Sequence, residues 1–282
     1  MRIFLTGAQG QLGHELQRTL HQHDLVLADL PAFDLLSPPA EDQIVESRPQ
    51  VVLHAAAYTD VEGAEREPEK AHAVNVEGTA RVAQAAAKAG ARLVVISTDY
   101  VFDGRKGQPY LETDEPHPLG VYAKTKRAAE VQALARCPHT LIVRTAWLYG
   151  QHGKNFVKTI LRLARERSEL RVVSDQRGSP THAGDLARAL AQVIQTELTG
   201  VTHAVGEGDC TWHEFAQAIV TLAGLKTPVI PITTAEANLK APRPPYSILA
   251  NRVLARVGIT LPHWKDALAR FVEQVEAKVE VE

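Results

Sequence analysis

The stretch TGAQGQLG, residues 6–13, decides the fold. It contains three glycines at a fixed spacing, Gly7, Gly10 and Gly13. A short apolar run, Arg2–Thr6, precedes it, and from about Gln11 onward leucines recur at helical spacing. A strand, a glycine turn and a helix in this order present free N–H groups and a positive dipole end to a pyrophosphate. The stretch predicts a dinucleotide-binding turn, although the pattern also fits an ordinary tight turn between strand and helix.

The composition narrows the class of protein. The chain has 282 residues, of which 45% are hydrophobic and 23% charged, as in a globular protein with a substantial core. Its net charge of −2 favours neither nucleic acid nor a membrane surface as a partner, and no stretch approaches the ~18 apolar residues of a membrane span. Two cysteines, Cys137 and Cys210, cannot build a disulfide framework, which fits a cytoplasmic protein. The twelve histidines are scattered, so no metal site is expected.

Apolar runs and helical stretches alternate along the first half of the chain. The expected strands are Arg2–Thr6, Leu25–Ala28, Val51–His54, Leu93–Ser97 and Thr140–Arg144. The expected helices between them are Glu41–Ser47, Glu67–Ala89 and Tyr122–Ala135. This order predicts an α/β fold of the Rossmann type, a doubly wound parallel sheet with helices on both faces. We therefore assign residues 1–150 to a dinucleotide-binding domain.

Beyond about residue 150 the pattern loosens. The expected helices there are Asn155–Glu166, Ala183–Gln195, Trp212–Ala223 and His263–Lys278. The expected short strands are Arg171–Ser174, Thr202–Val205 and Val229–Pro231. We expect residues 151–282 to form mainly a smaller substrate-binding lobe that is interleaved with the sheet domain.

An acidic residue at the end of the second expected strand supports dinucleotide binding. Asp29 lies about 20 residues after the first glycine, where a carboxylate accepts hydrogen bonds from an adenosine ribose. Asp34 and Leu35 follow and could flank the adenine. The alternative is that Asp29 is a turn residue before Pro31.

A second pattern concerns proton transfer. In YAKTK (122–126), Tyr122 and Lys126 stand one helical turn apart on the same face. A neighbouring ammonium favours the phenolate and is expected to bring the pKa of Tyr122 towards neutrality. The preceding strand ends at Thr98, whose hydroxyl could polarise a carbonyl group that Tyr122 protonates. The alternative is an ordinary amphipathic helix, because Tyr-x-x-x-Lys is frequent by chance.

These motifs together resemble those of the extended short-chain dehydrogenase/reductases. They include the glycine turn, the run Ala55-Ala56-Ala57 after a strand, Asn75, and the set Thr98, Tyr122 and Lys126. More narrowly, the chain resembles the dTDP-4-dehydrorhamnose reductases in six ordered motifs: STDYVF (97–102), YAKTK (122–126), RTAWLYG (144–150), NFVKTIL (155–161), DQRGSPT (175–181) and RPPYSIL (243–249). The resemblance implies reduction of the C4 keto group of dTDP-4-dehydro-6-deoxy-L-mannose with NADPH or NADH. The product would be dTDP-L-rhamnose, a precursor of cell-wall polysaccharide.

The resemblance also implies residue roles. The cofactor's pyrophosphate would contact the glycine turn at Gly7, Gly10, Gln11, Leu12 and Gly13, and its adenosine end Asp29, Asp34 and Leu35. The nicotinamide side would be lined by Ala56, Ala57, Tyr58 and Thr59, with Tyr122 and Lys126 completing it. The sugar would contact Thr98, Asp99, Tyr122 and Trp147, and Arg243 could grip its diphosphate. Taken alone, Trp147 fits the core equally and Arg243 fits a solvated surface. The chain departs from the common Thr-x-Val-Asp pattern in reading Thr59-Asp60-Val61-Glu62.

Two other functions fit the same motifs. Nucleotide-sugar 4,6-dehydratases share the fold and often carry Thr-Asp-Glu, where this chain has Thr98-Asp99-Tyr100. Replacing that glutamate by Tyr100 removes the obvious base for elimination, which favours a reductase over a dehydratase or epimerase. A non-catalytic regulatory subunit of the same fold is the remaining alternative, and nothing in that role requires Thr98, Tyr122 and Lys126.

The resemblance extends to assembly and metal binding. Members of the family are often homodimers, sometimes with Mg²⁺ near the interface. Glu15 on the first helix matches a position implicated in that site. The sequence itself shows no closed set of metal ligands.

Overall fold

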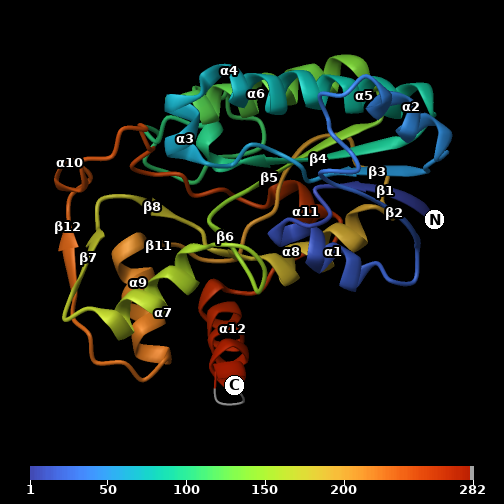
Figure 1. Ribbon diagram of the computed structural model, residues 1–282. Helices are drawn as coiled ribbons and strands as arrows, with labels where there is room; N and C mark the ends of the chain where they lie inside the picture. The colour runs from blue at the N-terminus through green and yellow to red at the C-terminus, as the bar shows by residue number, and fades with distance from the viewer. Residues whose placement is uncertain (280–282) are drawn as a thin grey trace.

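The computed structural model describes residues 1–279, and its centre is a six-stranded parallel sheet (Figure 1). The strands run in the order β10-β5-β4-β3-β1-β2. Their bounds are β1 Arg2–Thr6, β2 Asp24–Ala28, β3 Val51–His54, β4 Arg92–Thr98, β5 Thr140–Thr145 and β10 Gly200–His203. From β1 the chain moves to β2 on one side and then to β3 on the other. This reversal makes the edge beside β1 and β3 a ligand crevice in doubly wound folds.

Continuous apolar sequence explains the central strands. Every residue of β3 and β5 is buried, as are Ile3–Thr6 of β1. Strands covered on both faces lose the alternation of apolar and polar residues that a half-exposed strand shows. The sheet therefore needs helices on both sides.

Two groups of helices supply this cover. On one face α1 (Gln11–Thr19) packs against α8 (Ala183–Val193), and their leucines share a core with the strands. On the other face lie α2 (Pro39–Glu46), α5 (Thr79–Lys88) and α6 (Val121–Arg136), as Figure 1 shows above the sheet. The Rossmann-type fold that the sequence predicts is confirmed.

The expected helix Glu67–Ala89 is divided. It consists of α4 (Pro68–His72), a π-helical turn at Ala73–Gly78 and then α5, with a separate short helix α3 (Val61–Arg66) before it. The π turn lies where buried Asn75 hydrogen-bonds the loop after β3. The sequence prediction merged these segments because helix-forming, alanine-rich sequence continues through them, and a single π turn inside a helix has no composition of its own.

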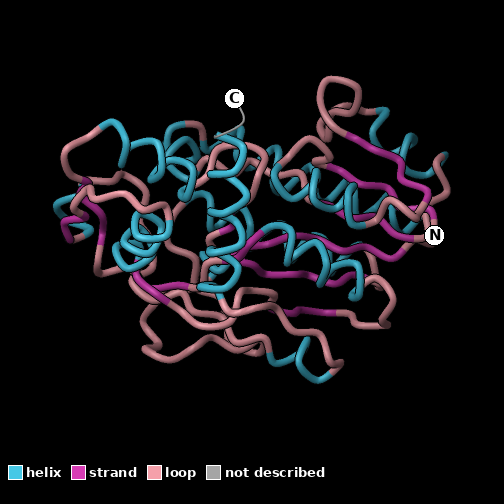
Figure 2. Tube along the Cα trace, turned by 90° about the horizontal axis from the view of Figure 1, so that it is seen from below, coloured by secondary structure: helices cyan, strands magenta, loops and turns pink. Residues whose placement is uncertain are grey.

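The second half of the chain forms a lobe to one side of the sheet (Figure 2). Its helices are α7 (Phe156–Glu166), α9 (Trp212–Leu222) and α12 (Trp264–Val279), with the short α10 (Thr234–Ala237) and α11 (Arg252–Arg256). The strands are β6 Leu148–Tyr149, β7 Leu170–Val173, β8 Arg177–Gly178, β9 Thr181–His182, β11 Cys210–Thr211 and β12 Val229–Ile232. Strands β7 and β12 pair in parallel. The lobe has its own apolar core, in which Phe215 and Phe271 are fully buried.

One expected strand of the lobe belongs elsewhere. The strand expected at Thr202–Val205 begins and ends two residues earlier, as β10 (Gly200–His203), and it lies in the central sheet beside β5. Helix α8 likewise covers that sheet. The second half of the chain thus contributes to both parts, because a short strand does not show in sequence which neighbour it pairs with. Within residues 1–279, no helix combines the length and apolar character that a membrane crossing requires.

Candidate active site

A cleft of about 1090 Å³ opens at the carboxyl ends of the central strands. The turns that follow β1, β2, β3, β4 and β5 all contribute to it. Residues expected from the sequence line it together: Gly7, Gly10, Gln11, Leu12, Gly13, Asp29, Asp34, Leu35, Ala56, Ala57, Thr59, Thr98, Asp99, Tyr122, Lys126 and Trp147. Segments distant in sequence therefore meet in one site.

The backbone of the glycine turn packs too closely against neighbouring backbone to admit side chains at Gly7 and Gly13. Gly7 has φ +70°, and a Cβ there would lie 2.6 Å from the backbone nitrogen of Ala56. A Cβ on Gly13 would lie 2.1 Å from the carbonyl oxygen of Gly7. Helix α1 begins at Gln11 with no side-chain cap, so its first N–H groups face the cleft as an anion-binding end.

Asp29 is held in place by the backbone. Its carboxylate accepts hydrogen bonds from the Gln9 nitrogen and from the Leu30 nitrogen, both at 2.8 Å. These bonds join the end of β2 to the glycine turn. The side chain lines the cleft where the two strand ends meet, in keeping with its expected place at a ribose.

The loop after β3 is fixed by Asn75. The Asn75 side chain accepts a hydrogen bond from the Tyr58 nitrogen at 2.8 Å and donates one to the Tyr58 carbonyl at 3.2 Å. It also donates to the Thr125 hydroxyl at 3.0 Å, one residue before Lys126. Buried Asn75 therefore couples this loop to helix α6, which carries the proposed proton donor.

Thr98, Tyr122 and Lys126 all line the cleft. Thr98 ends β4, while Tyr122 and Lys126 stand on one face of α6. The Lys126 ammonium donates to the Ile96 carbonyl at 2.8 Å. This bond ties the helix to the strand beside the reactive residues.

The expected lowering of the Tyr122 pKa is wrong for this structure. Burial raises the pKa of Tyr122 to about 12, a hydrogen bond with Thr98 opposes the rise, and the nearby Asp99 adds to it. Lys126 points its ammonium at a strand carbonyl, and burial lowers its own pKa to about 8. Loss of solvent outweighs the neighbouring charge because Lys126 is buried and Tyr122 is partly buried. Tyr122 is consequently protonated at neutral pH.

Asp99 is a buried carboxyl group beside Thr98. Its Oδ1 accepts a hydrogen bond from the Thr98 hydroxyl at 3.1 Å. Its buried Oδ2 has no hydrogen-bond partner among residues 1–279. Burial raises the pKa of Asp99 to about 7.

Trp147 forms a wall of the cleft in a strained conformation. Its φ of 45° lies in the left-handed region, which a bulky residue rarely adopts. The indole stacks on Trp212 at 3.5 Å between ring centroids, nearly parallel at 7°. A Cβ on Gly178 would meet this ring at 2.5 Å. The surrounding packing therefore holds the indole beside the cleft.

Comparison with known proteins assigns the family. The model of the RmlD substrate binding domain matches residues 1–277. The chain belongs to this family. It is 42% identical to a dTDP-4-dehydrorhamnose reductase of Mycobacterium tuberculosis, over 95% of this chain and 91% of that protein.

Solved structures support the same assignment. The dTDP-4-dehydrorhamnose reductase of Bacillus anthracis, solved in complex with NADP, superposes with a TM-score of 0.94 at 41% identity, over 97% of this chain and 99% of that one. The dTDP-glucose 4,6-dehydratase DesIV of Streptomyces venezuelae, at 20% identity and a TM-score of 0.83 over 97% and 96% of the two chains, shares the fold alone. The resemblance to the dTDP-4-dehydrorhamnose reductases is confirmed.

Two of the expected site residues do not line the cleft. The Tyr58 hydroxyl turns away and donates to Glu67 at 2.9 Å. The Arg243 guanidinium pairs with Glu62 at 2.8 Å, and it also donates to the Ala241 carbonyl at 3.1 Å. Glu62 is the residue that departs from the family pattern, and here it holds the proline-rich loop against the loop after β3.

Sequence reasoning missed several lining residues. They are Gln9, Ala28, Leu30, Phe33, Ala55, Asp60, Val74, Ile96, Ser97, Thr145, Ala146, Leu148, Gly153 and Lys154. Lys154 adds a cation that no local motif marks. The next residue, Asn155, caps α7 and donates to the Gln11 side chain of the glycine turn at 2.9 Å, a contact between distant segments that brings this loop to the cleft.

Proposed function

We propose that this protein reduces the C4 keto group of dTDP-4-dehydro-6-deoxy-L-mannose to give dTDP-L-rhamnose, with NADPH or NADH as reductant. One observation carries the proposal: a phosphate-binding glycine turn and the set Thr98, Tyr122 and Lys126 line a single cleft. Family membership supplies the substrate class. NADPH is favoured as a cofactor because the relative from Bacillus anthracis was solved with NADP.

The residues present fit a dinucleotide. Gly7 and Gly13 let the turn pack closely against neighbouring backbone, and the turn and the start of α1 line the cleft, where free N–H groups suit a pyrophosphate. Asp29, Asp34 and Leu35 would hold the adenosine end, and Ala56, Ala57 and Thr59 the nicotinamide side, together with Lys126. The bound cofactor supplies the hydride.

The chain's own residues would handle the proton. Thr98 would hydrogen-bond the C4 carbonyl oxygen as negative charge develops on it, and Tyr122 would donate its hydroxyl proton to that oxygen. The raised pKa of Tyr122, about 12, keeps this proton in place until the carbonyl oxygen becomes basic. Asp99 and Trp147 would contact the sugar, and Arg243 would reach the diphosphate only by leaving its ion pair with Glu62.

The residue at position 100 separates this proposal from dehydration. Tyr100 is enclosed, and its ring lies edge-on to Tyr122 at 6.1 Å between centroids. Burial raises the pKa of Tyr100, so its phenol is a poor base for removing a proton from carbon. The second candidate function is that of a dehydratase or an epimerase of the same fold.

A coupled assay tests the proposal. The protein is incubated with dTDP-4-dehydro-6-deoxy-L-mannose and NADPH or NADH, and the expected result is one reduced cofactor consumed per keto sugar, with dTDP-L-rhamnose as product. With dTDP-glucose and NAD⁺ we expect no 4-keto-6-deoxy product. Dehydration of dTDP-glucose would instead establish the second candidate function, that of a dehydratase. Absence of turnover together with stoichiometric, salt-resistant co-purification with another enzyme would establish a regulatory subunit.

The family resemblance and the two cysteines support proposals about the protein's oligomeric state and its location in the cell. We propose a cytoplasmic homodimer that binds a dTDP-sugar and neither nucleic acid nor membrane. Cys137 and Cys210 are both free and buried, as suits a reducing compartment.

Magnesium does not fit the residues around Glu15. The Glu15 carboxylate is paired with Arg18 at 2.8 Å. The part of the chain that the structure describes contains no group of three or more histidine, cysteine, aspartate or glutamate side chains able to hold a metal ion. Mg²⁺ needs a set of oxygen ligands in octahedral geometry, and we assign it no role.

A further inference from the structure

Trp212 lies behind one wall of the cleft. Its indole does not line the cleft itself, but it stacks on the indole of Trp147, which does. The two ring centroids are 3.5 Å apart, and the planes are inclined by 7°. Trp147 belongs to the short connection between β5 and β6, whereas Trp212 is the first residue of α9. The stack therefore connects the end of a central strand with a helix of the lobe.

The conformation of Trp147 depends on support from its surroundings. Its φ of 45° lies in the left-handed region, which is unfavourable for a residue with a bulky side chain. Such conformations persist only where the surrounding structure determines them. A hydrogen bond from the Thr181 nitrogen to the Trp147 carbonyl, at 3.3 Å, holds the peptide. This bond does not orient the side chain, so the contacts of the ring decide where the indole lies.

Trp212 is itself held firmly. It begins α9, whose N-terminus is closed by a capping box between Thr211 and Glu214. The Glu214 carboxylate accepts a hydrogen bond from the Thr211 nitrogen at 2.7 Å, and the Glu214 nitrogen donates to the Thr211 hydroxyl at 3.1 Å. Phe156 also packs on the Trp212 indole, with the ring centroids 4.5 Å apart. A capped helix end and an aromatic contact make Trp212 a fixed surface for the Trp147 ring.

Gly178 approaches the Trp147 ring closely. A Cβ on Gly178 would lie 2.5 Å from Cε2 and 2.6 Å from Nε1 of the indole. Gly178 belongs to β8, which pairs with β11 directly before α9. The strand pairing fixes Gly178 relative to the start of α9. Any side chain at this position would therefore displace the indole from its place beside the cleft.

From the stack, the left-handed backbone of Trp147 and the close approach of Gly178, we infer that Trp212 is a positioning residue for sugar binding. Trp212 holds the Trp147 indole beside the cleft, so that this wall is in place before the sugar enters. A preformed wall raises affinity because no binding free energy is used to order it. The inference rests on the proposed function, in which Trp147 contacts the sugar. Trp212 acts only through Trp147.

Steady-state kinetics of keto-sugar reduction by the full chain test the inference. Trp212→Leu removes the stacking face, Trp212→Phe restores an aromatic face, and Gly178→Ala displaces the indole without altering Trp212. Trp264→Leu is the matched control, because Trp264 and Trp212 both pack against Phe215 in the core of the lobe and neither lines the cleft. Urea denaturation shows that each variant is folded, and Trp264→Phe replaces the control if the leucine variant does not fold.

We expect Trp212→Leu to raise the KM for the keto sugar about three- to tenfold, which corresponds to the loss of one aromatic pair. The kcat and the KM for NADPH should stay near their parental values, because a contact made equally in the ground state and the transition state changes KM alone. Gly178→Ala should resemble Trp212→Leu, whereas Trp212→Phe should recover most of the affinity. The control should keep the parental KM. The affinity for dTDP-L-rhamnose, measured by calorimetry with NADP⁺ bound, should fall by the same factor as KM rises.

NMR of the indole N–H groups provides a readout that does not depend on turnover. The chain has three tryptophans, and replacing each with phenylalanine assigns its signal. In Trp212→Leu we expect the Trp147 signal to broaden, because the ring takes up several orientations, and to sharpen again when dTDP-L-rhamnose is added. In the Trp264 control it should stay as sharp as in the parent.

Parental KM and parental affinity for dTDP-L-rhamnose in Trp212→Leu would overturn the inference and leave the proposed function standing. Equal increases of KM in Trp212→Leu and in the Trp264 control would also overturn it, since they would reflect a loosened lobe. So would a sharp Trp147 signal in Trp212→Leu, because the indole would then be held without Trp212. If the parent neither reduces the keto sugar nor binds dTDP-L-rhamnose, the proposed function fails, and this inference fails with it.

Discussion

At the scale of single residues, Tyr122 is the decisive test of the proposed chemistry. Tyr122→Phe keeps the ring that lies edge-on to Tyr100 but removes the proposed proton donor. We expect turnover to fall by about 10²–10⁴, as for loss of a general acid, while cofactor affinity measured by fluorescence titration changes little. Turnover at the parental rate in the phenylalanine variant would rule out this role for Tyr122.

Asp29 allows a second test at this scale. Its carboxylate is oriented by the Gln9 and Leu30 nitrogens, and a negative charge there repels the 2′-phosphate of NADPH. Asp29→Asn keeps a hydrogen-bond acceptor and removes the charge. We expect the ratio of NADPH to NADH affinity to rise, and Asp29→Ala to weaken NADH binding more than NADPH binding. If both variants keep the parental ratio, the ribose is held by another group such as Asp34.

At the scale of elements, a buried ionic cluster fastens α6 to the sheet. Glu130 stands one turn after Lys126 and accepts hydrogen bonds from Arg144 at 2.8 and 2.7 Å and from Ser97 at 2.6 Å. Burial alone would raise the pKa of Glu130, but the hydrogen bonds from Arg144 and Ser97 hold it below its ordinary value. The cluster therefore fixes the helix that carries Tyr122 against the strand that carries Thr98.

Breaking the buried pair of Glu130 and Arg144 is expected to lower the free energy of unfolding. Glu130→Gln leaves the guanidinium of Arg144 buried without its counter-charge, and we expect a loss of about 3–5 kcal/mol in the free energy of unfolding. Arg127→Gln, which removes the more exposed partner of Glu130, should cost below about 1 kcal/mol. Urea denaturation measures both. Similar losses in the two variants would contradict a dominant Glu130–Arg144 pair.

At the scale of the whole molecule, buried histidines in separate parts of the fold link stability to pH. His54 at the end of β3 is enclosed between the hydroxyls of Thr6 and Thr79 at 2.7 and 3.0 Å. Burial lowers the pKa of His54 to about 3, and likewise that of His182 to about 4 and that of His203 to about 3. The unfolded chain binds protons from about pH 6.5 downward and the folded chain does not, so stability is lost as the pH falls from about 6.5 towards 4.

The His54→Gln variant isolates one contribution. Between pH 7 and pH 5 a single histidine of this kind accounts for about 2 kcal/mol of lost stability. We expect the variant to lose about that much less than the parent over this interval, whatever its stability at pH 7. His21→Gln serves as the control because His21 is exposed. An unchanged pH dependence in His54→Gln would show that His54 is protonated in the folded protein.

The sequence by itself determined the local structural features of this protein. The glycine turn, the apolar strands and the one-turn spacing of Tyr122 and Lys126 each depend on contiguous residues, whose periodicity and allowed backbone angles can be read directly. Thr98 and Asp29, which these features single out, both line the cleft. Locally encoded geometry survives folding because each element keeps its own hydrogen-bond pattern.

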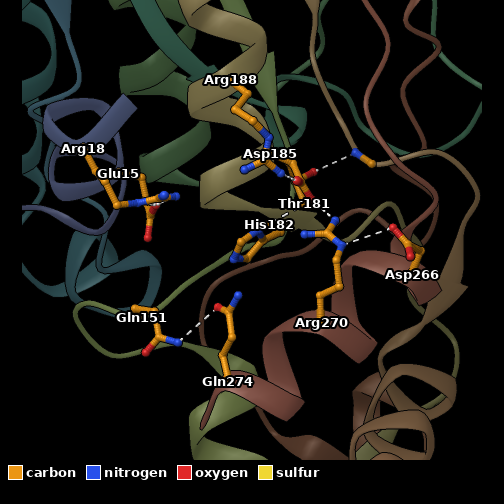
Figure 3. Close-up of polar contacts among 11 residues, drawn as sticks. Glu15, Arg18, Gln151, Thr181, His182, Asp185, Arg188, Asp266, Arg270 and Gln274 are labelled. Atoms are coloured by element: carbon orange, nitrogen blue, oxygen red, sulfur yellow. Dashed lines mark hydrogen bonds and ion pairs between the residues drawn. The ribbon is translucent and has the colours of Figure 1, made fainter. Parts of the chain in front are cut away.

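Only the tertiary structure decided what depends on distant partners. Strand β10 joined the sheet through pairing with β5, and Arg243 paired with Glu62 far away in sequence. Burial reversed the expected direction of the Tyr122 pKa shift, because the loss of water is set by all the segments that pack around a side chain. A smaller cleft, of about 630 Å³, arises in the same way where α1, α8 and α12 meet (Figure 3). Desolvation and charge pairing are properties of the assembled surroundings, which no single stretch of sequence contains.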